Sequence, residues 1–470
     1  MDVLVVLVYL VAMIAFGFWG RRRAQSQSDF LVAGRRLGPM LYSGTMAAVV
    51  LGGASTIGGV GLGYQYGLSG MWLVVAIGVG ILVLSLAFAG RIQRLRVYTV
   101  GQMLELRYGP GSSVLSGVVM WAYTLMLAVT STIAYATIFA ALLDLGKVPS
   151  ILLGGTVVVI YSTLGGMWSI TLTDFVQFAI KTVGIFFLLL PIVLSRAGGW
   201  AGLQAALPVD AFSLTAIGGG TILTYFVIYT FGLLIGQDIW QRVFTARSPG
   251  VARWAGTAAG VYCLLYGVAG AVIGMSAKVL LPDLDAADDA FAHVVEATMP
   301  TLLAGLVLAA ALSAVMSTSS GALIATATVF GQDILGKLRG RVAQSDDHAG
   351  DSRWLVAGFG VVMIVIACLL QDVVAALTVA YDILVGGLLV PIIGGLVWRR
   401  GTGALAAMGV GTVATLVTMF VVGDLYANEP VYVGLATGLV AYVAGSLATR
   451  PTDPEVLAEW DARSRTTVDA

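Results

Sequence analysis

The sequence predicts an all-α polytopic membrane protein of about thirteen transmembrane helices. Of the 470 residues, 59% are hydrophobic and only 11% are charged, whereas a typical soluble domain is about 25% charged. The mean hydropathy is +0.94, so the chain must keep most of its surface out of water. The formal net charge is zero, and nothing in the charge balance predicts a nucleic acid partner.

Apolar runs long enough to cross a bilayer follow one another along the chain. A hydrocarbon core about 30 Å thick requires roughly 20 apolar residues per helix. Basic residues follow the first run, whereas a cleaved signal peptide carries its positive charge in front, so we expect this helix to be retained. By the length criterion we expect spans over residues 2–20, 40–62, 67–90, 113–143, 149–164, 168–195, 217–240, 253–278, 301–330, 354–371, 373–398, 402–422 and 430–449.

The basic residues predict the orientation in the membrane. With the N-terminus outside, the inner loops and the tail contain 21 Lys and Arg residues, and the outer loops contain three, Lys147, Arg196 and Lys278. An excess of basic residues marks the cytoplasmic side. We therefore expect the N-terminus out and the C-terminus in, in the cell (inner or plasma) membrane, with a mobile polar tail.

No group of residues predicts catalysis. The two histidines, His293 and His348, lie in or beside expected loops, and no His-Glu-x-x-His motif occurs. Residues 331–337 resemble the start of a phosphate loop, but Leu338 replaces the Ser or Thr that would bind Mg²⁺. We therefore expect neither an enzyme nor an ATP-driven pump.

The second expected span is rich in glycine, with six in the thirteen residues from Leu51 to Gly63. Each glycine weakens a helix by about 1 kcal/mol relative to alanine. One interpretation is a broken helix whose free carbonyls bind a cation. The other is a small-residue seam for helix packing, and this segment alone favours neither.

The ninth expected span contains four consecutive hydroxyl side chains, Ser317 to Ser320. Ala314, Ser317 and Thr318 have the spacing that places residues on one helical face. Hydroxyl and carbonyl oxygens are ligands for hard cations. The hydroxyls could instead bond to carbonyls of their own helix, but four together favour a cation site.

Two ionisable residues are expected inside the sixth span, where such groups are functional candidates. Asp174 lies near its inner end and could reach water. Lys181 lies about 10 Å further along the axis, at 1.5 Å per residue. Lys181 could pair with a carboxylate on another helix, and Asp382 in the eleventh span is the candidate.

Several motifs resemble those of the sodium/solute symporter family. They occur in the same order as in the family and extend over nearly the whole chain. The most specific is Tyr-Ser-Thr-Leu-Gly-Gly-Met-Trp-Ser at residues 161–169, followed by Thr-Asp-Phe-Val-Gln at 173–177. Supporting motifs occur at residues 30–38, 237–244 and 327–334.

The resemblance implies a LeuT-type fold of two inverted five-helix repeats, over residues 40–195 and 217–398. Residues 1–39 would form a leading helix and an inner loop, 402–449 two trailing helices, and 450–470 a cytoplasmic tail. It also implies a secondary active transporter that moves a small organic solute with Na⁺ by alternating access. We expect it to act as a monomer in the lipid bilayer.

The resemblance also implies a sodium site and no other metal. Some members hold a second sodium at the position of Asp174 with hydroxyls that include Ser320. Here Gly321 stands where two-sodium members have a hydroxyl, so we expect one Na⁺ per solute. Carried over by position, the first site consists of the carbonyls of Ala54, Ile57 and Ala314 with the hydroxyls of Ser317 and Thr318.

The expected solute-lining residues are small and hydroxylic. Relatives that carry acidic sugars have an arginine in the fourth span, and none occurs between Val114 and Leu143. We expect an organic acid or amino acid, whose carboxylate a half-helix N-terminus could hold. The alternative is a proton-coupled symporter that uses Lys181 or Asp174. The expected lining residues are Thr56, Gln65, Thr130, Ser131, Thr132, Tyr225 and Tyr229.

Overall fold

The computed structural model describes residues 2–143, 145–339, 349–370, 373–423 and 427–465. In these residues every regular element is helical, apart from one isolated bridge between Leu37 and Ala246. Ten described helices are long and apolar enough to cross a membrane, or eleven if one bent pair counts as a single span. The all-helical, multi-pass expectation is therefore confirmed, and the number thirteen remains a prediction.

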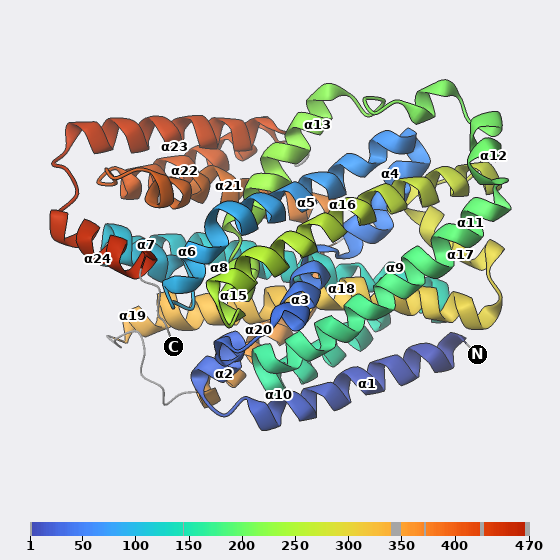
Figure 1. Ribbon diagram of the computed structural model, residues 1–470, viewed down its shortest axis with the longest axis horizontal. Coiled ribbons are helices and arrows are strands. Elements are labelled where there is room, and N and C mark those ends of the chain that lie inside the picture. Colours follow the sequence, from blue (N-terminus) through green and yellow to red (C-terminus); the bar gives the residue numbers. More distant parts are fainter. Residues whose placement is uncertain (1, 144, 340–348, 371–372, 424–426, 466–470) are drawn as a thin grey trace.

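The helices run side by side and mostly along the long axis of the molecule (Figure 1). The first half contains α1 (Asp2–Arg23), α2 (Gln27–Val32), α3 (Pro39–Val50), α4 (Gly59–Tyr66), α5 (Trp72–Val83), α6 (Ala89–Arg94), α7 (Val100–Tyr108), α8 (Pro110–Ile133), α9 (Tyr135–Leu143), α10 (Lys147–Thr182), α11 (Leu190–Arg196) and α12 (Gly199–Ala206). The second half contains α13 (Gly219–Tyr225), α14 (Phe231–Ile235), α15 (Gln237–Thr245), α16 (Pro249–Leu280), α17 (Ala290–Thr298), α18 (Thr301–Val329), α19 (Gly336–Leu338), α20 (Ala349–Leu369), α21 (Val373–Val397), α22 (Ala404–Val422), α23 (Glu429–Ala448) and α24 (Pro454–Arg465).

The second expected span is interrupted. Helix α3 has twelve residues, too few to cross a bilayer alone, and it ends where Leu51 leaves helical geometry with φ −95° and ψ 68°. The chain re-enters a helix in a π-helical turn, η2 (Ala54–Gly58), which continues directly into α4. The glycine-rich run thus forms a broken helix rather than a continuous packing seam.

The 50-residue apolar run that includes α10 reverses direction at Gly166, whose φ is +54°. Before this point Tyr161 packs closely against Gly17 of α1. After it Gln177 donates a hydrogen bond to Tyr9 Oη at 3.0 Å, about two turns back toward the start of α1. The two arms therefore run in opposite directions along α1.

Helix α18 lies at the centre and packs against α8, α10 and α1. The trailing helices α22 and α23 pack mainly on each other and on α21. The tail was expected to be mobile, and over its described part that prediction is wrong. Residues 454–465 form α24, which packs on α6 and α7 and buries Trp460.

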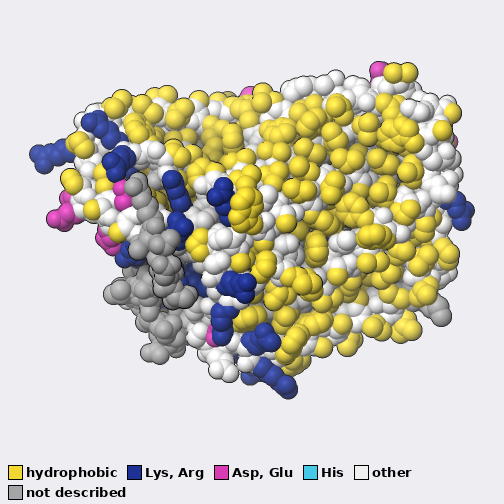
Figure 2. Space-filling view, in the orientation of Figure 1, with side chains coloured by type: hydrophobic (Ala, Val, Ile, Leu, Met, Phe, Trp, Pro, Cys, Tyr) yellow, Lys and Arg dark blue, Asp and Glu magenta, His cyan; other side chains and the backbone are white. Residues whose placement is uncertain are grey.

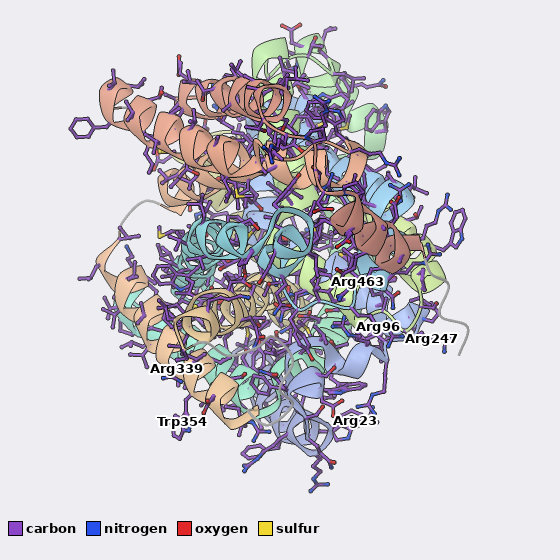
Figure 3. The ribbon with its side chains drawn as sticks, turned by 90° about the vertical axis from the view of Figure 1, so that its left-hand side faces the viewer. Arg23, Arg96, Arg247, Arg339, Trp354 and Arg463 are labelled. Atoms are coloured by element: carbon purple, nitrogen blue, oxygen red, sulfur yellow. The ribbon has the colours of Figure 1, made fainter. Side chains whose placement is uncertain are left out.

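The outer surface has the polarity of a membrane protein. Hydrophobic side chains cover most of the face in Figure 2, and Lys and Arg gather toward the end formed by α6, α7, α15 and α24. Figure 3 looks onto that end, where five arginines are labelled: Arg23, Arg96, Arg247, Arg339 and Arg463. An apolar surface this extensive indicates contact with lipid.

Candidate solute cavity and cation site

Two interrupted helices meet inside the bundle. The first is the break between α3 and η2. The second is at Gly236, where α14 ends and α15 begins with a bend of 44°. Each break lies in the first helix of one of the two expected repeats. At membrane depth, irregular backbone is tolerated only where protein buries it or where it lines a cavity, so both breaks mark a candidate site.

A cavity of about 70 Å³ lies between the two breaks. The first break contributes Gly52 and Ala54 to its wall, and the second contributes Asp238 and Ile239. Leucine and isoleucine side chains from α5 and α8 form much of the remaining wall, together with Tyr381 of α21. This is a small, largely apolar chamber that contains one carboxylate.

The structure brings three of the expected lining residues to this cavity. Thr130 and Ser131 reach it from α8, and Tyr229 reaches it from the π-helical turn η7 (Phe226–Thr230). The ring of Tyr229 packs on Tyr381 with centroids 5.6 Å apart, and Tyr381 packs on Tyr123 at 5.3 Å. A layer of tyrosines therefore closes one side of the chamber.

Four other expected lining residues lie elsewhere. Thr56 shares a hydrogen bond of 2.8 Å with Tyr266 Oη of α16, and Thr132 shares one of 3.0 Å with Ser319. Gln65 is exposed and lines a separate pocket at the end of α4. Tyr225 packs on Tyr229, with centroids 5.8 Å apart, outside the cavity lining.

Sequence reasoning missed the carboxylate of the cavity, Asp238, which is 3% exposed. Tyr123 Oη donates to Asp238 Oδ1 at 3.3 Å. The sequence feature that could have identified Asp238 is its position two residues after Gly236. There an apolar run ends and a new helix begins. A carboxylate beside a helix break is a candidate ligand for a solute.

A cluster of oxygen atoms lies beside the cavity, at the end of α3. Ser317 Oγ donates to the Ala48 carbonyl at 2.8 Å, and Thr318 Oγ1 donates to the Val49 carbonyl at 2.7 Å. Lys181 Nζ donates to the carbonyls of Ala48 and Leu51. The last carbonyls of a helix lack hydrogen-bond partners within that helix. Here side chains of α10 and α18 provide the missing donors. We call the Ala48, Val49 and Leu51 carbonyls the carbonyl cradle.

Only some of the expected sodium ligands lie together in the structure. Ser317 and Thr318 also donate to the Ala314 carbonyl, at 2.9 and 3.4 Å, so these three residues do lie together. Their other hydrogen bonds go to the carbonyl cradle and not to Ala54 or Ile57, which lie beyond the break in η2. The reason is that α3 ends before its glycine pair, so the freed carbonyls precede the glycines.

Asp174, the possible ligand of a second cation, is fully buried rather than near water. Arg242 Nη2 of α15 lies 3.2 Å from Asp174 Oδ2, and Thr45 Oγ1 of α3 donates to the same oxygen. Gly321 makes room for this pair, because a Cβ there would lie 2.5 Å from Arg242 Nη2. Ser320 donates to the Ser317 carbonyl at 3.2 Å. Asp174 therefore links the two broken helices.

The candidate pairing of Lys181 with Asp382 does not form. Both side chains are buried, but the amino group of Lys181 donates to backbone carbonyls of α3. Asp382 lies on α21, and its Oδ1 has no hydrogen-bond partner among the described residues. Sequence alone could not rank backbone acceptors against a carboxylate for this lysine.

Two broken helices that start the two halves of a helical membrane bundle and enclose a small cavity define the class of secondary active transporters. The chain belongs to the sodium:solute symporter family, whose family model matches residues 30–411. As expected, the family contains transporters and not enzymes, and its membership indicates sodium as the coupling ion.

The similar proteins are transporters as well. A sodium/proline symporter of Staphylococcus aureus (strain NCTC 8325 / PS 47) is 25% identical over 357 residues, which cover 72% of this chain and 69% of the relative. A Na⁺-coupled sialic acid symporter solved in a substrate-bound, outward-open state has a TM-score of 0.83 at 18% identity, covering 96% and 98% of the two chains. MhsT in complex with L-phenylalanine has a TM-score of 0.59 at 11% identity, covering 87% and 99%.

Proposed function

We propose that this chain is a Na⁺-coupled symporter of a small neutral amino acid. The observation that carries the proposal is the cavity itself, where a helix N-terminus and the Asp238 carboxylate face the same small space. A transported amino acid has one negative and one positive group, and both need a partner once they leave water.

Each charged group of an amino acid has a candidate partner in the cavity. Gly53 and Ala54 begin the helical segment that continues into α4, and the first N–H groups of a helix lack partners within the helix. A carboxylate is stabilised at such a terminus. The solute's ammonium group would then pair with Asp238. An organic acid without an amino group would instead meet the charge of Asp238, so we favour an amino acid.

The relatives support this solute class to different degrees. The Staphylococcus aureus relative is named for proline, a small amino acid. The sialic acid symporter shares the fold at only 18% identity. The arginine that acidic-sugar carriers have in the fourth span is absent here between Val114 and Leu143, which argues against an acidic sugar.

We also propose one sodium ion per solute, bound by Ala314, Ser317 and Thr318 together with carbonyls of the broken helix. The support is Asp174, whose charge is balanced by the buried guanidinium of Arg242. A second sodium at Asp174 would have to displace that ion pair.

For the topology we propose thirteen spans with the N-terminus out and the C-terminus in, in the cell membrane. Gly166 and Gly67, both with positive φ, separate two spans within each of the longest apolar runs. The start of α1 and the helix α24 lie at opposite ends of the molecule (Figure 1), and the arginines of Figure 3 support the proposal that the α24 end is the inner side. The repeat boundaries 40–195 and 217–398 and a functional monomer are part of the same proposal.

The test is uptake into proteoliposomes that contain the purified full chain. Radiolabelled L-proline, L-alanine, L-serine, L-lactate and N-acetylneuraminate would each be offered under a sodium gradient and, separately, under a proton gradient. We expect one of the three amino acids to accumulate under the sodium gradient alone, with a sodium Hill coefficient near one. Accumulation only of lactate or of the sugar acid would overturn the amino acid proposal. Accumulation under the proton gradient alone would favour the alternative, proton coupling through Lys181 or Asp174.

A further inference from the structure

The carbonyl cradle is already occupied by an amino group that belongs to the chain. Lys181 Nζ lies 2.9 Å from the Ala48 oxygen and 3.1 Å from the Leu51 oxygen, and the side chain is fully buried. The Ala48 oxygen also accepts from Ser317 Oγ. A sodium ion that binds Ser317 and the end of α3 would need the same carbonyl oxygen.

We propose that Lys181 is a tethered competitor of sodium: its amino group occupies the carbonyl cradle, and sodium binds there only after the side chain has left. The inference rests on the proposed sodium coupling and adds a residue that sets sodium affinity. Because the apparent affinity of a site falls with the fraction of molecules in which it is free, Lys181 would raise the sodium concentration that the transporter needs.

The contacts of Lys181 would allow its amino group to be displaced from the carbonyl cradle. The ionisable groups that interact with it are Asp174 on its own helix and Cys263 on α16. Asp174 is already paired with Arg242, so it does not form an ion pair with Lys181. The lysine is held by two backbone carbonyls, and a flexible four-carbon stem allows its amino group to move.

The cradle also adjoins the solute cavity. Thr318 donates to the Val49 carbonyl, and both Thr318 and Val49 line the cavity wall. Exchange of Lys181 for sodium would therefore take place directly beside the solute. Competition between Lys181 and sodium could therefore affect solute binding directly, without the movement of another helix.

The experiment measures equilibrium binding of radioactive ²²Na⁺ to the purified full-length protein, without solute. We compare wild type with Lys181→Met and with Lys181→Leu, which both remove the amino group from the two carbonyls. If Lys181 fills the cradle in about nine-tenths of wild-type molecules, both variants should reach half-saturation at about tenfold lower sodium. Adding Ser317→Ala to Lys181→Met should abolish that gain, which locates the bound ion at the cradle.

Two controls separate this effect from a general change in charge. Lys278→Met removes a lysine that also donates to a backbone carbonyl, that of Pro282 at 2.8 Å, outside the cradle. It should leave sodium binding unchanged. Lys181→Arg keeps a positive charge and should bind sodium as weakly as wild type.

The outcomes are distinct. Unchanged or weaker sodium binding in folded Lys181→Met and Lys181→Leu overturns the inference, as does equal tightening in Lys181→Arg. If neither neutral variant folds, the deciding measurement is the labelling of Lys181 in wild type by a small amine-reactive compound. Sodium, unlike potassium, should increase the labelling of Lys181. If sodium does not increase the labelling, the inference is overturned. Tight ²²Na⁺ binding by Lys181→Met without sodium-driven uptake in wild type would leave the inference standing and refute the proposed function.

Discussion

The two broken helices interrupt their spans at the wall of the same cavity, yet they present opposite chemistry. At the first break, the carbonyls at the end of α3 face Lys181, Ser317 and Thr318. At the second break, the start of α15 carries the Asp238 carboxylate into the cavity. In the proposed function, the first break therefore offers neutral oxygen dipoles to the cation, and the second offers a carboxylate to the solute.

This difference shows how one structural device can serve two ligands. A helix break frees carbonyls on one side and N–H groups on the other, and the neighbouring helices decide which of them stay available. Arg242 of α15 and Thr45 of α3 both bind Asp174 of α10. The two breaks are thus joined by one buried carboxylate, and their relative position depends on it.

The largest expected effect comes from cutting that link. Arg242→Met leaves Asp174 buried without its partner, and losing one partner of a buried ion pair costs about 3–5 kcal/mol. We expect the variant to lose most of its folded population, as measured by thermal unfolding of the purified protein. Thr45→Val removes only one hydrogen bond to the same carboxylate and should cost about 1–3 kcal/mol. Equal stability of Arg242→Met and wild type would show that the breaks are positioned independently.

A smaller effect is expected at the second break alone. Asp238→Asn removes the negative charge from the cavity, and hydrogen bonds to charged groups contribute about 1.5–3 kcal/mol. We expect the half-saturating concentration of the transported amino acid to rise by roughly tenfold to a hundredfold, with stability retained. Tyr123→Phe, which removes the 3.3 Å hydrogen bond to Asp238 but not the charge, should have a much smaller effect. A similar rise in both variants would mean that Asp238 acts through Tyr123 and not on the solute.

The first break can be tested through its glycines. A Cβ at position 52 would lie 2.5 Å from Thr318 Oγ1, whereas a Cβ at position 58 would meet nothing within 4 Å. Gly52→Ala should therefore push Thr318 from the cradle, at a cost of about 1–3 kcal/mol for overpacking, and reduce sodium-driven uptake. Gly58→Ala is the matched control and should transport normally. Loss of uptake in the control as well would point to backbone flexibility rather than close packing.

The smallest effect is expected from single hydroxyls of α18. Ser317→Ala removes one oxygen near the cradle, and a typical hydrogen bond contributes about 0.5–1.5 kcal/mol. We expect the sodium concentration for half-maximal uptake to rise by roughly threefold to tenfold. Ser320→Ala removes a hydroxyl that donates to its own helix and should leave sodium dependence unchanged. If Ser320→Ala had the larger effect, the sodium site would lie further along α18.

Several features follow from local sequence and could be predicted. Apolar run length predicted the membrane helices, and the glycine content between Leu51 and Gly63 suggested a broken helix as one of two interpretations. Helical spacing placed Ala314, Ser317 and Thr318 on one face, where the structure has them together. Composition, run length and i, i+3, i+4 spacing are properties of a few consecutive turns, so the sequence carries them without reference to the rest of the chain.

Other features depended on contacts between residues far apart in the chain. The register of the break decided that Ala48 and Val49, not Ala54 and Ile57, meet Ser317 and Thr318. The sequence placed Asp174 and Lys181 in one span, but only the packing of α3, α10 and α15 gave Asp174 an arginine and left Lys181 to backbone carbonyls. A buried charge takes whichever partner lies within about 3 Å, and separation along the chain does not fix that distance. The sequence therefore identified Asp174, Ser317 and Thr318 as candidate cation ligands. Only the tertiary structure decided that Asp174 is already paired with Arg242 and that Lys181 occupies the carbonyls beside Ser317.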